Sequence, residues 1–345
     1  MVATIWQEIL KKDRIDIFSN FFELGGHSIM AINVMIKIEK ETGRRIPLSS
    51  LFQHSTIEKL ALLLNTDNEI ASDFLVPIKP NGNKTPLFMV HGAGLNILNF
   101  ANVINHFDEE QPVYGFQGIG PNGYHNWFKS IEEMAACYID SILKTNPKGP
   151  YAIAGFSFGG IVAFEIARQL KKQGKIVSII VLLDTYVDSS YYYSSPLQKN
   201  IVKYYDLTYR RFDFLIEMLT SWKSLKYRAN AKKNHVLKKY FGLNNIMTEQ
   251  ELLALTEFKK ASSMVDKIVE RYHLKPLDVE VDLFRANDDK DYKLDQKHLG
   301  WKKAALKGVK IHNVTGNHLG IVEPPNDKIL AKMIQDILDE KHANI

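Results

Sequence analysis

The sequence predicts a small all-α helical bundle followed by a doubly wound, mostly parallel α/β domain with a helical lid insertion. Three observations lead to this prediction. Apolar residues recur at helical spacing within residues 1–65, and short apolar strands alternate with helices from residue 86 onward. The alternation is interrupted at about residues 186–270 by a helical, aromatic and basic stretch between two strands.

The first 65 residues predict several short helices. "ATIWQEIL" places its apolar residues on one helical face, and "SIMAINVMIKIEKETG" predicts a second helix that starts at Ser28 and ends at Gly43. In "STIEKLALLL", Ser55 and Glu58 fit a capping box at the start of a further helix. A unit of residues 1–65 is close to the lower limit for an independent core, but it is feasible.

Residues 66–84 are rich in Asn, Asp, Pro and Gly, which predicts a linker with a short docking strand at its end. The α/β domain is then expected over residues 85–345, with its lid at about 186–270. Its strands are predicted at 86–90, 112–116, 151–156, 178–184, 281–286 and 309–316.

The composition, with 45% hydrophobic and 24% charged residues, is that of a soluble globular protein. No apolar run is long enough to span a bilayer, the start lacks a signal-peptide pattern, and the single cysteine excludes a disulfide framework. We therefore expect a cytoplasmic protein with no membrane partner and no metal site. Residues 186–249 hold 11 Lys/Arg against 5 Asp/Glu, so the net charge of +5 is local and predicts no nucleic-acid partner.

A candidate nucleophile lies in "YAIAGFSFGGIVAFEIARQL", where the pattern G-x-S-x-G stands between a predicted strand and a predicted helix. The two glycines permit a sharp turn that exposes the hydroxyl of Ser157. The backbone N–H of Phe158, at the helix N-terminus, then points at a developing oxyanion. "FMVHGAG" follows the first strand of the domain, and we expect the second oxyanion N–H from Ala93.

The partners of such a serine follow it in the order acid, then histidine. His318 lies in the Gly-flanked loop "GNHLGIV" after the last strand and is the predicted base. Two positions are candidates for the acid: Asp184 ends one strand, and Asp288 or Asp289 follows the next. Both place a carboxylate at the carboxyl end of a parallel strand, where it can orient the histidine.

"FFELGGHSIMAI" resembles the core motif of carrier proteins in nonribosomal peptide synthetases, and "LFQHSTIEKLA" is similar to the end of the same domain. The resemblance implies that Ser28 carries a covalent 4′-phosphopantetheine. A phosphodiester is favoured at a helix N-terminus, and Gly25 and Gly26 are expected to keep the approach clear for a modifying enzyme.

The remainder of the chain resembles the type I thioesterase domains of the α/β-hydrolase family that end such synthetases, in "PLFMVHGAG", "GFSFGG", "VLLDTY" and "GNHLGIV". That resemblance implies Asp184 as the acid, with Asp288 in reserve. It also implies a chain-terminating thioesterase: an acyl or peptidyl group moves from Ser28 to Ser157 and is released by hydrolysis or macrocyclisation. The implied partners are upstream condensation and adenylation domains and a phosphopantetheinyl transferase.

Two alternative functions are also compatible with the sequence: a carrier fused to a non-catalytic hydrolase-like scaffold, and a general esterase with an accessory helical domain. The chain is either the excised end of a larger synthetase or a stand-alone unit. Two roles are open for the basic lid: a cap whose apolar side faces the acyl chain and whose basic side meets the phosphate of the arm or an acidic acyl chain, or a solvated amphipathic helical pair. Charge reversal at Arg210 and Arg211 would separate the two.

Overall fold

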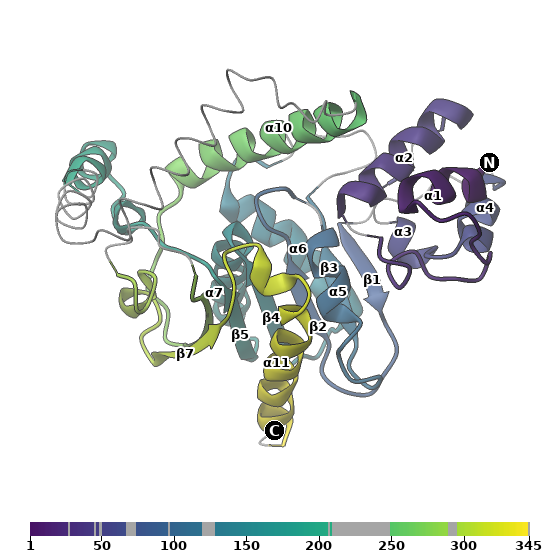
Figure 1. Ribbon diagram of the computed structural model, residues 1–345. Coiled ribbons are helices and arrows are strands. Elements are labelled where there is room, and N and C mark those ends of the chain that lie inside the picture. The colour runs from purple at the N-terminus through teal and green to yellow at the C-terminus, as the bar shows by residue number, and fades with distance from the viewer. Residues whose placement is uncertain are drawn as a thin grey trace, which may run out of the picture.

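The computed structural model describes residues 1–26, 28–44, 46–47, 50–66, 74–95, 97–118, 128–205, 208, 249–288 and 295–343. A helical region at the N-terminus lies beside a central sheet that is flanked by helices on both faces (Figure 1). The C-terminal helix runs along one of these faces. The arrangement is the predicted one, a helical bundle followed by an α/β domain.

The helical region contains α1 (Val2–Leu10), α2 (Ser28–Thr42), α3 (Ser50–Gln53) and α4 (Ile57–Leu64). Its core is apolar and aromatic. The rings of Trp6 and Phe21, both fully buried, meet edge to face with centroids 4.9 Å apart. The apolar faces predicted from the sequence therefore meet in one core of their own.

The ends of the helices follow the predictions with one correction. Gly43 follows α2 at a φ of 68°, which fits its predicted role as the C-terminal stop. The predicted N-cap at Ser55 is wrong, because Thr56 caps α4 by accepting the N–H of Lys59 at 3.2 Å. The Ser55 hydroxyl instead accepts the side-chain amide of Asn20 at 3.1 Å, so it holds the turn that precedes α2.

Over the residues that the structure describes, the sheet has seven strands in the order β1-β3-β2-β4-β5-β6-β7. The strands are β1 (Leu75–Lys79), β2 (Leu87–Val90), β3 (Val113–Phe116), β4 (Tyr151–Phe156), β5 (Val177–Leu183), β6 (Glu280–Ala286) and β7 (Gly308–Val314). Among these described strands, β1 is antiparallel to β3, and the other neighbouring pairs are parallel. All six strands predicted for the domain are present, and β1 lies inside the stretch predicted as a linker with a docking strand.

Two layers of helices bury the two faces of the sheet (Figure 1). The helices are α5 (Ala101–Ile104) and α11 (Asn326–His342) on one face, and α6 (Ile131–Thr145) and α7 (Phe158–Lys172) on the other. Strand β2 shows why both faces are apolar: Leu87 and Met89 pack with α5 and α11, while Phe88 and Val90 pack with α6 and α7. The carboxyl ends of the strands are thus held rigidly from both sides.

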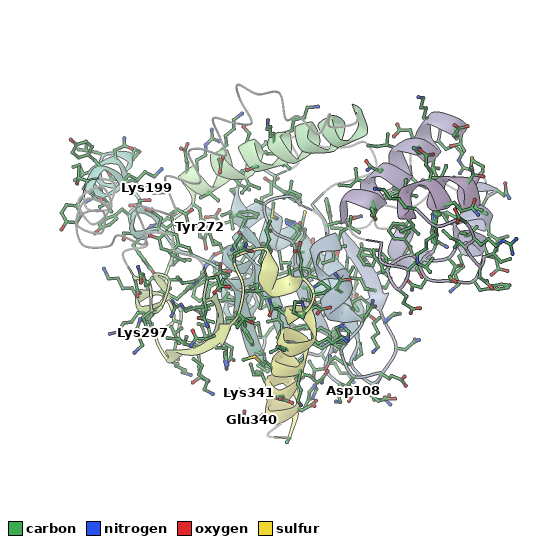
Figure 2. All side chains as sticks on the ribbon, in the orientation of Figure 1. Asp108, Lys199, Tyr272, Lys297, Glu340 and Lys341 are labelled. Atoms are coloured by element: carbon green, nitrogen blue, oxygen red, sulfur yellow. The ribbon has the colours of Figure 1, made fainter. Side chains whose placement is uncertain are left out.

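The insertion between β5 and β6 includes η2 (Ser189–Tyr192) and the long helix α10 (Glu249–Arg271). Residues 206–207 and 209–248, including Arg210 and Arg211, lie outside the described residues. Where α10 ends, the hydroxyl of Tyr272 donates to Glu165 Oε2 on α7 at 3.0 Å. The Lys199 Nζ donates to the Tyr272 carbonyl at 2.6 Å, and both side chains lie at that end of α10 (Figure 2). Among the described helices, none is long and apolar enough to cross a membrane.

The helical region packs against the α/β domain through apolar side chains. Leu98, in η1 (Leu98–Phe100), and Ala101 pack into the core of the helical region, and Phe52 of α3 lies against the cores of both domains. Helix α10 also reaches across to α2, the helix that begins at Ser28 (Figure 1). Helix α10 therefore contacts both the helical region and the α/β domain.

Candidate active site

The turn between β4 and α7 presents Ser157. Ser157 has a φ of 55° and a ψ of −120°, a conformation that a residue with a side chain adopts only when its surroundings impose it. The N–H of Ser157 donates to the Leu183 carbonyl of β5 at 2.9 Å, which fixes the turn to the neighbouring strand. A side chain at Gly155 would collide with the Gly159 carbonyl, and one at Gly159 with the backbone of His91. Both glycines of the motif are therefore required by close backbone approach.

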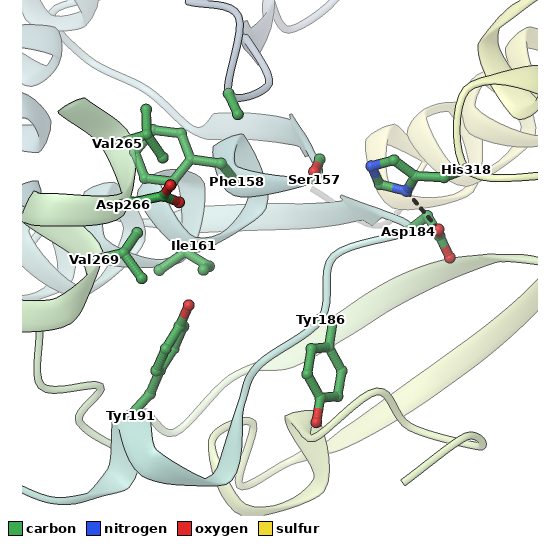
Figure 3. A pocket seen from close by; sticks show the side chains of 11 residues that line it. Ser157, Phe158, Ile161, Asp184, Tyr186, Tyr191, Val265, Asp266, Val269 and His318 are labelled. Atoms are coloured by element: carbon green, nitrogen blue, oxygen red, sulfur yellow. Dashed lines mark hydrogen bonds and ion pairs between the residues drawn. The ribbon is translucent and has the colours of Figure 1, made fainter. Parts of the chain in front are cut away.

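The predicted base and acid are paired. His318 Nδ1 lies 2.7 Å from Asp184 Oδ2, and Asp184 Oδ1 accepts the backbone N–H of Ala286 at 3.1 Å. Asp184 is 3% exposed, so its carboxylate depends on these bonds. Because a carboxylate only accepts, Nδ1 carries the proton and the other ring nitrogen is left to accept one. Figure 3 shows His318 between the two residues, with that second nitrogen facing Ser157.

Asp288, the alternative candidate for the catalytic acid, is hydrogen-bonded to the backbone of Gly316. Asp288 Oδ2 accepts the N–H of Gly316 at 3.1 Å, and the N–H of Asp288 donates to the Gly316 carbonyl at 3.0 Å. Gly316 begins the loop that carries His318, and the His318 ring stacks on Phe156 with centroids 4.8 Å apart. Asp288 therefore anchors the histidine loop, while Asp184 bonds the histidine itself. Asp289 lies outside the described residues.

The two candidate oxyanion residues line one cavity with Ser157. Phe158 is the first residue of α7, whose leading N–H groups have no acceptor within the helix, and Ala93 lies in the loop after β2. This cavity has a volume of about 360 Å³, and Asp184 and His318 line it as well. The rest of its wall comes from α7, the segment after β5, and α10: Ile161, Tyr186, Tyr191, Val265, Asp266 and Val269.

Sequence reasoning assigned no role to His91, although the residue stands inside the motif "FMVHGAG". Its ring is fully buried beside the loop that carries Ala93. Nδ1 donates to the Gly92 carbonyl at 2.9 Å, so Nε2 accepts the hydroxyl of Tyr138 at 2.7 Å. Burial lowers the pKa of His91 from 6.5 to about 4, which keeps the ring neutral. The partner, Tyr138, lies on α6 and is 47 residues further along the chain, so no local sequence pattern predicts this hydrogen bond.

The candidate attachment site lies at the start of α2. Ser28 is its first residue, His27 lies outside the described residues, and Gly25 has a φ of 95° with open space around it. Gly26 was predicted to leave room for the modifying enzyme. The structure adds a packing reason for this glycine, because a side chain there would collide with the ring of Phe21. A turn with open space before a helix N-terminus fits a covalently attached phosphodiester. Among the described residues, no group of three or more His, Cys, Asp or Glu is placed to hold a metal ion.

Fold and site together are those of an α/β-hydrolase domain that follows a helical carrier region. Residues 85–338 match the thioesterase domain family, and residues 2–64 match the phosphopantetheine attachment site family. The chain therefore belongs to the thioesterase domain family, and it carries a phosphopantetheine attachment domain with 4′-phosphopantetheine as its covalent cofactor. The resemblance predicted from the sequence motifs, a carrier followed by a thioesterase, is confirmed.

Similar proteins are found among peptide synthetases. The chain is 38% identical over 191 residues to malpinin synthetase of Mortierella alpina, which covers 54% of this chain and 2% of that protein. It is 36% identical over 187 residues to a dimodular nonribosomal peptide synthase of Bacillus subtilis, covering 54% of this chain and 8% of that protein. The chain thus spans only a small part of the curated relatives it matches.

Solved structures show the same fold. A four-domain nonribosomal peptide synthetase, holo-AB3403, superposes with a TM-score of 0.59 at 23% identity, covering 97% of this chain and 26% of that one. The NocB thioesterase domain in covalent complex with a fluorophosphonate nocardicin G analogue superposes with a TM-score of 0.53 at 20% identity, covering 77% of this chain and 99% of that one.

Proposed function

We propose that the chain terminates synthesis on a nonribosomal peptide synthetase by moving an acyl or peptidyl group from the carrier domain to Ser157 and releasing it. The observation that carries this proposal is the double contact of α10. That helix contacts α2, which begins at Ser28, and it lines the cavity that contains Ser157. The site of attachment and the site of release therefore share one structural element.

The proposed domain division keeps residues 1–65 as the carrier, 66–84 as the linker and 85–345 as the thioesterase. Ser28, at the start of α2, is the residue that would hold the phosphopantetheine. When bound, this group supplies a terminal thiol that carries the acyl group as a thioester. Because the carrier and the thioesterase belong to one chain, the effective concentration of thioester at the cavity is high without tight binding.

The chemistry at Ser157 follows from the pairing of His318 with Asp184. Ser157 Oγ attacks the thioester carbonyl carbon while His318 takes its proton, and the N–H groups of Phe158 and Ala93 hold the negative oxygen. The carbon–sulfur bond then breaks, and the proton on His318 passes to the departing sulfur. Asp184 holds the histidine in the required tautomer and stabilises its charged form.

Release repeats these steps with a second nucleophile. Water, or an amine or hydroxyl of the product itself, gives a proton to His318 and attacks the carbonyl carbon of the acylated serine. The bond to Ser157 Oγ breaks, and Ser157 recovers its proton from His318. We further propose that the partners are upstream condensation and adenylation domains and a phosphopantetheinyl transferase that modifies Ser28, and that the protein is cytoplasmic.

Intact-protein mass spectrometry over time tests the proposal. A phosphopantetheinyl transferase loads Ser28 with an acyl-pantetheine arm in the unaltered protein, in Ser157→Ala and in Ser28→Ala. We expect the acyl mass to disappear from the unaltered protein, to persist in Ser157→Ala, and never to form in Ser28→Ala. Persistence in both loaded proteins, across several chemically distinct acyl chains, would favour the scaffold. Equal turnover of soluble esters and of carrier-bound thioesters would favour a general esterase.

A further inference from the structure

The wall of the cavity contributed by the lid helix contains an acidic residue that the reaction does not use. Val265, Asp266 and Val269 of α10 line the same cavity as Ser157. Figure 3 shows their side chains on the side of the cavity opposite His318. Val265 and Val269 are four residues apart on one face of the helix, so Asp266 lies at the edge of an apolar stripe that faces the site.

Asp266 differs in chemistry from its neighbours in the wall. The adjoining residues are apolar or aromatic: Phe158, Ile161, Tyr186, Tyr191, Val265 and Val269. The other carboxylate of the cavity, Asp184, is bonded to His318. No lysine or arginine lines the cavity among the described residues. Asp266 is therefore the only cavity-lining carboxylate of the described part of the chain that is available to a ligand.

Within the part of the chain that the structure describes, the Asp266 carboxylate forms no ion pair and accepts no hydrogen bond. Its own helix supplies no cation, because the positions three and four residues away are Ser262, Ser263, Val269 and Glu270. The charge also affects its surroundings. Burial, and then the negative charges of Asp188 and Asp266, raise the pKa of Tyr191. The α10 side of the cavity thus carries the negative charge of Asp266, for which the described residues supply no partner.

We propose that Asp266 selects acyl chains that carry a protonated amine close to the carbonyl attached to Ser157. This inference rests on the proposed function and names the class of substrate for the same site. A carboxylate beside an apolar wall would pair with the ammonium group, while the methylene groups of the chain cover Val265, Val269 and Ile161. The cavity is at the small end of the range for ligand sites, so the recognised amine belongs to the residues nearest the carbonyl.

The expected size of the preference for amine-bearing chains follows from the solvent exposure of Asp266. Asp266 is exposed to solvent at one side of the cavity, so its pairing with an ammonium group is partly screened. We expect a roughly fivefold preference in kcat/KM for an amine-bearing chain over an isosteric neutral one. The preference must also shrink at high salt, which a purely steric selection would not do.

The test compares two soluble thioesters that differ only in the charged group: N-acetyl-lysyl and N-acetyl-norleucyl N-acetylcysteamine. The rate measured with Ser157→Ala is subtracted, which removes spontaneous cyclisation of the lysyl chain. The variants are Asp266→Asn, which removes the charge with little change of shape, and Asp266→Lys, which reverses it. The matched control is Glu270→Gln, which removes the same charge one turn further along α10, where the side chain does not line the cavity.

We expect the roughly fivefold preference for the lysyl over the norleucyl thioester in the unaltered protein and in Glu270→Gln, a ratio near one in Asp266→Asn, and a preference for the norleucyl thioester in Asp266→Lys. A ratio near one in the unaltered protein would overturn the inference and leave the proposed function in place, because Ser157 still turns over both chains. Retention of the preference in Asp266→Asn would also overturn it. If no thioester acylates Ser157, the proposed function fails and the inference fails with it.

Discussion

His318 Nδ1 lies 2.7 Å from Asp184 Oδ2, although the two residues are 134 positions apart in the chain. The pair is formed where β5 ends and where the loop after β7 returns to the same edge of the sheet. Asp184 is anchored to β6 through both its backbone and its side chain, because its backbone N–H donates to the Phe284 carbonyl at 2.8 Å and its Oδ1 accepts the N–H of Ala286. The acid is therefore held by β6 before it meets the histidine.

Replacing Asp184 by Asn should lower kcat by about 10³- to 10⁴-fold with little effect on folding. The amide fits the same space, but it favours the wrong tautomer of His318. Asp288→Ala should lower kcat by less than about tenfold, because Asp288 holds the histidine loop only through Gly316. Steady-state hydrolysis of a soluble thioester measures both effects. The assignment of the acid would be wrong if Asp288→Ala proved the more damaging of the two.

A methyl group at Gly159 should destabilise the thioesterase domain by about 3 kcal/mol or more, because the added Cβ would collide with the His91 and Val90 carbonyls. Gly174, just beyond the other end of α7, is the matched control. It has a φ of 74° but open space around it, so Gly174→Ala should cost only about 1 kcal/mol of backbone strain. Urea unfolding followed by tryptophan fluorescence compares the two. Equal costs would show that crowding at the elbow contributes nothing.

The neutral, buried His91 should make stability depend on pH. The pKa of His91 is about 4 in the folded protein and 6.5 in the unfolded chain, so between these values the unfolded chain binds the proton preferentially. The neutral ring therefore makes its full contribution to the free energy of unfolding above pH 6.5, and this contribution is lost as the pH falls towards 4. Over this window we expect a loss of about 3 kcal/mol.

His91→Gln is the comparison for this effect, because an amide can donate to the Gly92 carbonyl and accept from Tyr138 without titrating. The difference in free energy of unfolding between the unaltered protein and this variant should fall by about 3 kcal/mol between pH 7 and pH 4. Other titrating groups largely cancel in the difference. If the two stabilities run parallel over the whole window, His91 does not titrate with a lowered pKa.

The sequence predicted the sheet and the nucleophile turn because both depend on local patterns. The strands β2, β4 and β5 at the centre of the sheet are short apolar runs, and the pattern G-x-S-x-G between a strand and a helix predicts the position of Ser157. The choice between Asp184 and Asp288 could not be made in this way. Both follow neighbouring parallel strands, so both are near the loop that carries His318. In the structure, the Asp184 carboxylate bonds the His318 ring and the Asp288 carboxylate bonds the backbone of Gly316. This difference depends on the geometry of the loops, which the sequence pattern does not give.

Other features were missed for the same physical reason. Tyr138 reaches His91 from α6, and Asp266 reaches the cavity from α10, which follows Ser157 by about a hundred residues. Neither contact has a sequence signature, because each arises from packing between elements distant in the chain. The cap of α4 was displaced by one residue, since Ser55 is engaged by Asn20 and Thr56 takes its place.

The contact at Phe52 should control how well the carrier delivers its cargo. This side chain lies against the cores of both domains, and its ring stacks on Phe22 with centroids 4.9 Å apart. Phe52→Ala removes apolar area shared by the two domains, so we expect transfer from Ser28 to Ser157 to slow by about five- to twentyfold. Hydrolysis of a free thioester should keep its rate, because the cavity is untouched.

Phe18→Ala is the control for that prediction. Phe18 belongs to the same carrier region, but its side chain is 65% exposed, and it is absent from the cores of both domains. Transfer is followed by the intact mass of the acylated protein, and hydrolysis by release of the free thiol. If Phe52→Ala slows both reactions equally, Phe52 stabilises the enzyme as a whole. If it slows neither, the carrier reaches the cavity without this contact, and the position of α10 between α2 and Ser157 would have to guide it alone.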